Sequence, residues 1–156
     1  MITTLLNQYF KKRIDEIDKF SINVESIQKQ QLNSILEKAK FTEFGEKYKF
    51  IDIKSAEKFC ERIPIFSYET LQTYIDRMVK GEPNLLWPGK IEYFAQSSGT
   101  TGSKSKYIPV SKESFKTMHY KGGADTVALY LSQNAESKFF NGKSLVIGAG
   151  KSKANE

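Results

Sequence analysis

The sequence is poor in the residues that most often bind metals or form covalent catalysts. Its 156 residues contain one cysteine, Cys60, and one histidine, His119. A single cysteine excludes an internal disulfide, so we expect a reducing compartment, the cytoplasm. Cys60 lies in an apolar helical pattern and is expected in the core. Because His119 has no Cys or His nearby in the sequence, we predict no metal site.

Arginine and long apolar runs are also scarce. Only three of the 24 basic residues are arginines, although the formal net charge is +6. The lysines are scattered along the chain, which is typical of solvated faces and disfavours nucleic-acid binding, where arginine forks predominate. The N-terminus turns polar at Asn7, too early for a signal peptide, and no apolar run is long enough to cross a membrane. We therefore expect neither nucleic-acid nor membrane partners.

Residues 1–90 are predicted to be mainly helical, because apolar residues recur there at helical spacing. The predicted helices cover 2–20, 24–39, 56–62 and the segment from Ser67 to Gly81. Ser55 and Ser67 are candidate N-caps, and Gly81 is a candidate helix end. The segment with Phe41, Phe44 and Gly45 is predicted as a loop.

Residues 91–156 follow the order strand, loop, strand, helix, strand. The predicted strands are 91–95, 107–110 and 143–148, and the predicted helix runs from its cap at Ser111 to Gln133. A tight loop between the first two strands requires an antiparallel pair. The whole chain, 1–156, is thus predicted as a mixed α/β (α+β) unit with an incomplete sheet. The uncovered strand around 145–147 predicts self-association of the chain.

The connection between the first two of these strands is rich in glycine and small hydroxyl side chains. Its candidate ligand-binding residues are Ser97, Ser98, Gly99, Thr100, Thr101, Gly102 and Lys106. The glycines let backbone N–H groups turn inward, and the hydroxyls can donate to phosphate oxygens. Lys106 would neutralise the charge that develops on a leaving pyrophosphate. The loop therefore predicts a site for the phosphates of ATP, although an ordinary hairpin loop would have a similar composition.

The same loop resembles the first nucleotide-binding motif of the GH3 family of acyl-acid amido synthetases, which are adenylate-forming enzymes. The family pattern is S-S-G-T-[ST]-x-x-x-x-K followed by I-P, and residues 97–101, Lys106, Ile108 and Pro109 match it. Acyl-CoA synthetases carry a shorter loop with proline directly before the lysine, where this chain has Ser105. The segment His119 to Gly123 is similar to the bacterial branch of the family.

The resemblance implies an ATP-dependent enzyme that joins a carboxylic acid to an amine, typically of an amino acid, through an acyl-AMP intermediate. Lys106 would be the catalytic residue, and Mg²⁺ would be held chiefly by phosphate oxygens. The family's chains are several times longer. The resemblance therefore implies that this chain is the N-terminal portion of the large adenylation domain, without the C-terminal lid domain, and that it is inactive alone.

Two alternatives remain open from the residues themselves. The chain could be a small stand-alone phosphate- or nucleotide-binding module, which would bind ATP tightly and lose affinity on Lys106→Ala. It could also be a lysine-rich interaction domain, which would bind an acidic partner in a salt-sensitive manner. Substitution of Ser98 or Thr100 would then have no effect on binding.

Overall fold

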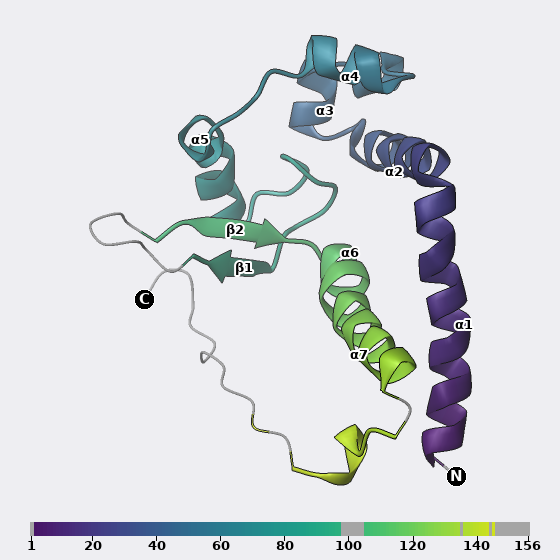
Figure 1. Cartoon of the computed structure of the whole chain (residues 1–156). Helices are drawn as coiled ribbons and strands as arrows, with labels where there is room; N and C mark the ends of the chain where they lie inside the picture. Colours follow the sequence, from purple (N-terminus) through teal and green to yellow (C-terminus); the bar gives the residue numbers. More distant parts are fainter. Residues whose placement is uncertain (1, 98–104, 135, 144, 146–156) are drawn as a thin grey trace. The chain divides into compact units, whose positions relative to one another are not determined.

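The computed structural model describes residues 2–97, 105–134, 136–143 and 145, and it divides into two compact units (Figure 1). One unit joins residues 1–22 to 116–156, and the other is 23–115. The elements are α1 (Ile2–Ile22), α2 (Val24–Ala39), α3 (Glu43–Lys47), η1 (Phe50–Asp52), α4 (Ala56–Arg62), α5 (Tyr68–Val79), β1 (Tyr93–Gln96), β2 (Tyr107–Val110), α6 (Lys112–Ser114), the π-helix η2 (Phe115–Tyr120), α7 (Lys121–Gln133) and η3 (Phe139–Asn141). Helices dominate, which confirms the mixed α/β class. No helix in the described ranges is long and apolar enough to span a membrane.

The first unit is built on the packing of α1 against α7 (Figure 1). An ion pair reinforces this packing: the Arg13 guanidinium donates to both carboxylate oxygens of Asp125, at 2.6 and 2.8 Å. Arg13 also donates to Glu16 within α1, at 2.7 Å. The Arg13 side chain is only 12% exposed, so it needs these acceptors.

Replacing Asp125 with asparagine is expected to lower the free energy of unfolding of this unit by about 1–3 kcal/mol, because Arg13 would keep its burial but lose a charged bidentate partner. Amide hydrogen exchange along α1 measures the effect. Glu16→Gln is the matched control, since the Glu16 side chain is 47% exposed and should cost under about 1 kcal/mol.

The same pair predicts a pH dependence. The hydrogen bond from Arg13 lowers the pKa of Asp125 below its usual range. The stabilisation is therefore complete at neutral pH and is lost as the pH falls through that lowered pKa. Protection of α1 that persists unchanged in strong acid, or in Asp125→Asn, would contradict this account.

The second unit, residues 23–115, has two small hydrophobic clusters. The first contains Leu36, Ala39, Phe50 and Ile53, and the second contains Met78, Leu85 and Ile91. Trp87 is half-buried and packs against both, as expected for a core tryptophan. In α5, Ile75 and Met78 are buried on the face that the spacing predicted. Gly81, with φ of 94°, follows the end of α5 as expected.

Helix α3 lies where we predicted a loop. Thr42 is its N-cap, and the Thr42 hydroxyl oxygen accepts a hydrogen bond from the Gly45 N–H. The N–H groups of Glu43 and Phe44 donate to the carbonyls of Asn84 and Leu85, at 2.8 and 3.0 Å. These contacts join residues 41 positions apart in the sequence, so no local pattern could predict them.

Two further expectations need correction. Cys60 is exposed on α4, because its neighbours Phe59 and Ile63 take the positions that pack against the first cluster. Strand β1 begins at Tyr93 rather than Ile91, because Tyr93 pairs with Val110, the last residue of β2 before Ser111 caps α6. The helix predicted from Ser111 to Gln133 is present, although residues 115–120 are π-helical. The third predicted strand, 143–148, lies largely outside the described residues.

Candidate functional site

The hairpin brings Ser97 and Lys106 together at the base of the glycine–hydroxyl loop. In its antiparallel ladder Gln96 pairs with Tyr107 as the last strand residues. Beyond them the Ser97 N–H donates to the Lys106 carbonyl at 3.0 Å, and the Lys106 N–H donates to the Ser97 hydroxyl oxygen at 2.9 Å. These two bonds form a neck that closes the loop, and they hold two of the predicted site residues in fixed positions.

The other predicted loop residues are Ser98, Gly99, Thr100, Thr101 and Gly102, and all five lie outside the described residues. Their role with phosphate stays a prediction. What the structure contributes is the neck from which they extend.

The Lys106 side chain turns to the first turn of α5. Its ammonium nitrogen lies 2.8 Å from a carboxylate oxygen of Glu69 and 4.8 Å from the centre of the Tyr68 ring. The hydrogen bond from Lys106, together with the Glu69 backbone N–H and the Ser67 side chain, lowers the pKa of Glu69 to about 2. Glu69 is therefore a carboxylate throughout the physiological pH range.

Sequence reasoning missed Tyr68 and Glu69 as part of this site. Glu69 stands just after the cap Ser67, where an acidic residue is ordinarily explained by the helix dipole. The loop lysine is 37 residues away, and no spacing connects the two. Only the packing of α5 against β2 brings them together.

The neck has the groups that phosphate oxygens require. The Lys106 ammonium has three N–H donors, and the side chain that carries it is 43% exposed, so it can reach a ligand. The Ser97 hydroxyl accepts from the Lys106 backbone, which leaves its own O–H available to donate. Within the described part of the chain no group of three or more His, Cys, Asp or Glu residues could hold a metal ion. A divalent cation that accompanies the nucleotide would thus need phosphate oxygens as ligands.

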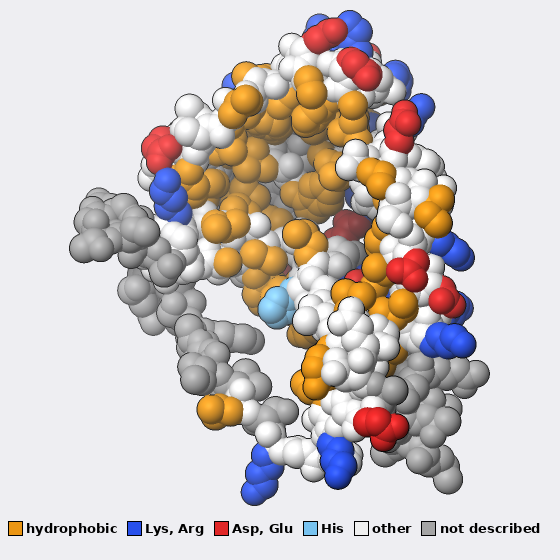
Figure 2. All heavy atoms as spheres, in the orientation of Figure 1, with side chains coloured by type: hydrophobic (Ala, Val, Ile, Leu, Met, Phe, Trp, Pro, Cys, Tyr) orange, Lys and Arg blue, Asp and Glu red, His pale blue; other side chains and the backbone are white. Residues whose placement is uncertain are grey.

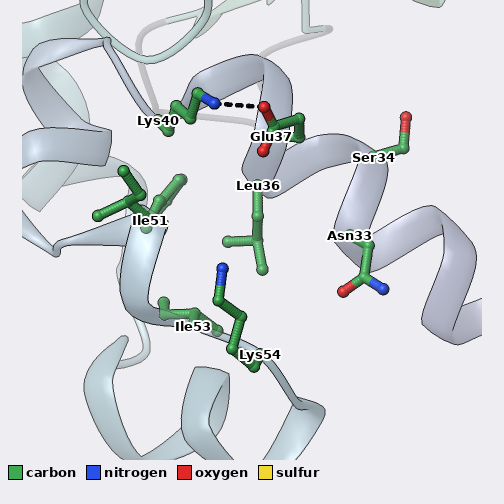
Figure 3. Close-up of a pocket in the computed structure, with 9 residues that line it drawn as sticks. Asn33, Ser34, Leu36, Glu37, Lys40, Ile51, Ile53 and Lys54 are labelled. Atoms are coloured by element: carbon green, nitrogen blue, oxygen red, sulfur yellow. Dashed lines mark hydrogen bonds and ion pairs between the residues drawn. The ribbon is translucent and has the colours of Figure 1, made fainter.

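A hollow of about 460 Å³ lies elsewhere in the second unit, between α2 and η1 (Figure 3). Leu36 and Ile53 are among its apolar lining residues, and Lys40 and Lys54 are its basic ones. Lys40 forms an ion pair with Glu37, which also lines the hollow. Neither Ser97 nor Lys106, the two predicted loop residues that the structure describes, lines this hollow, so it is separate from the neck.

Comparison with known proteins identifies the family. The model of the GH3 family N-terminal domain matches residues 13–155. Among curated proteins, the 4-substituted benzoates-glutamate ligase GH3.12 of Arabidopsis thaliana is 34% identical over 67% of this chain and 18% of its own length. The jasmonoyl–L-amino acid synthetase JAR4 of Nicotiana attenuata is 29% identical over 85% of this chain and 22% of its own length.

A solved structure agrees with these sequence matches. The AtGH3.15 acyl acid amido synthetase in complex with 2,4-DB superposes with a TM-score of 0.71 at 26% identity, over 81% of this chain and 22% of that chain. The fold therefore matches the N-terminal part of a GH3 acyl acid amido synthetase.

The chain belongs to the GH3 family and matches its N-terminal domain. It spans about a fifth of the length of the curated relatives described above. These relatives are plant proteins, so they give no support to the bacterial branch that we expected from the sequence.

Proposed function

We propose that this chain is the phosphate-binding N-terminal part of an acyl acid amido synthetase. The enzyme would use ATP and Mg²⁺ to join a small carboxylic acid to an amino acid or another amine. The observation that carries the proposal is the match of residues 13–155 to the GH3 family N-terminal domain. The hydrogen-bonded neck supports it, because Ser97 and Lys106 belong to the segment whose sequence resembles the family's nucleotide-binding motif.

In the proposed reaction a carboxylate oxygen attacks the α-phosphorus of ATP, and the bond to pyrophosphate breaks. The amine then displaces AMP to form the amide. The loop residues Ser97 to Gly102 would hold the phosphates with N–H and O–H donors, and the Lys106 ammonium would stabilise the charge on the departing pyrophosphate. The Mg²⁺ ion, when bound, supplies further neutralisation of phosphate charge.

Exposed apolar surface supports the idea that further protein covers this part. Hydrophobic side chains are widespread on the face in view in Figure 2. In the second unit Phe41 is 71% exposed and Ile51 56%, while Ile65 is fully exposed. Where such side chains form a contiguous patch, they usually mark an interface. We therefore propose that the chain forms the N-terminal part of the large adenylation domain, which further protein covers. Self-association, a cytoplasmic location and the bacterial branch also stay predictions.

The test is pyrophosphate release from Mg-ATP, measured with the 156-residue chain and with a full-length GH3 protein that contains it. We expect the full-length protein to release pyrophosphate only when a carboxylic acid is present, and to release AMP when an amino acid follows. The isolated chain should release none, because it cannot align both reactants. Acid-independent ATP hydrolysis by the full-length protein, or turnover by the isolated chain, would contradict the proposal.

A further inference from the structure

The Lys106 ammonium is held by two side chains from one helical turn. Glu69 accepts its hydrogen bond at 2.8 Å, and the Tyr68 ring lies 4.8 Å away, within reach of a cation–π interaction. Tyr68 and Glu69 are the first two residues of α5. The first turn of α5 thus binds the Lys106 ammonium, the group that the loop motif predicts to bind phosphate.

The contact does not depend on the flexible lysine side chain alone. The Tyr68 hydroxyl oxygen accepts a hydrogen bond from the backbone N–H of Tyr107 at 3.0 Å. Tyr107 follows Lys106 directly and is the first residue of β2. Because this bond joins the first turn of α5 to the hairpin backbone, Glu69 stays beside the neck even when Lys106 moves.

The Glu69 carboxylate stays ionised, but its ion pair with Lys106 can be replaced by another. Its position in the first turn of α5 and the hydrogen bonds described above keep it ionised. Its side chain is 66% exposed, so water can solvate the carboxylate once Lys106 leaves. Exposed ion pairs of this kind are weak and open readily. A triphosphate, with several oxygens and more charge, competes well for the same ammonium.

We propose that Glu69 is a positioning residue. It holds the Lys106 ammonium at the neck of the loop, and a phosphate oxygen replaces its carboxylate as the partner of the ammonium when nucleotide binds. The proposal rests on the proposed function, because it takes Lys106 as the phosphate-binding lysine. Tyr68 remains in place during the exchange as a neutral surface beside the lysine stem. Glu69 itself makes no contact with the reacting atoms.

The test is the rate at which an amine-selective acylating reagent labels Lys106, read by mass spectrometry with and without millimolar Mg-ATP. In Glu69→Gln, which keeps the size of the side chain but not its charge, we expect labelling without ATP to be about two- to five-fold faster than in wild type, the range set by weak exposed ion pairs. Glu69→Asp should return the rate toward wild type. In wild type and in Glu69→Gln, ATP should slow the labelling.

The matched control is Glu92→Gln. Glu92 forms an ion pair with Lys112 at 2.9 Å in the same unit, and its loss should leave Lys106 labelling unchanged. Thermal unfolding of each variant shows that the fold is retained. If Lys106 is labelled equally fast in wild type and Glu69→Gln, and ATP protects it in both, the role of Glu69 is wrong while the phosphate role of Lys106 stands. If ATP protects Lys106 in neither protein, the phosphate role of Lys106 and the exchange both fail.

Discussion

Replacing Lys106 with alanine is expected to lower carboxylate-dependent pyrophosphate release by about 10²- to 10³-fold in a full-length GH3 protein that contains this chain. The removal of one positioned donor from a site of developing negative charge has an effect of this size. The change should appear mainly in kcat, because charge builds up on pyrophosphate as the bond to it breaks. Initial rates measured at saturating acid and ATP give the value.

The matched control is Lys112→Ala, since Lys112 lies on α6 and pairs with Glu92 rather than with the loop. It should leave the rate within a factor of about two, as expected for an exposed side chain outside the site. Thermal unfolding should change little in either variant, because both lysines are substantially exposed. If the Lys106→Ala enzyme keeps the wild-type kcat, Lys106 does not stabilise the charge on the leaving pyrophosphate.

Gly45→Ala is expected to destabilise the second unit by about 2–4 kcal/mol. Gly45 is buried in α3, and a Cβ atom there would lie 2.0 Å from the carbonyl oxygen of Ala39 and 2.9 Å from its carbon. That carbonyl cannot move freely. It accepts hydrogen bonds from the Thr42 N–H at 3.0 Å and from the Thr42 hydroxyl at 2.7 Å.

Urea unfolding of the second unit, followed by the fluorescence of Trp87, measures this loss. Gly123→Ala is the control, because a Cβ at Gly123 on α7 meets no atom within 4 Å. Because Gly123 lies in the first unit, this substitution should leave the Trp87 transition of the second unit unchanged. Equal stabilities of Gly45→Ala and wild type would show that α3 does not pack on Ala39 as described.

The helices were predictable from local sequence because their caps and apolar spacings are local. The hydroxyls of Ser55, Ser67 and Ser111 accept hydrogen bonds from backbone N–H groups three residues later, as their positions before the predicted helices indicate. Helix α3 could not be found in this way. Its first N–H groups are satisfied by the carbonyls of Asn84 and Leu85, which only the folded chain brings close.

The candidate site likewise has residues that the local sequence predicts and one that only the tertiary fold supplies. Ser97 and Lys106 could be predicted together, because a short loop between paired strands places its ends side by side. Their partner Glu69 could not, since α5 and β2 meet only in the tertiary fold. Cys60 shows the converse failure: an apolar helical pattern fits more than one face, and packing selected Phe59 and Ile63.

The function proposed for this chain requires that the loop between β1 and β2 binds the phosphates of a nucleotide. The direct measurement is an NMR titration of the ¹⁵N-labelled chain with ATP, pyrophosphate and adenosine. We expect the backbone amide signals of residues 97–106 to shift with ATP and with pyrophosphate at millimolar concentrations. Adenosine should leave them unchanged, and Lys106→Ala should weaken the response. Shifts that bypass these amides and cluster instead around the hollow between α2 and η1, or a full response in Lys106→Ala, would contradict phosphate binding by the loop.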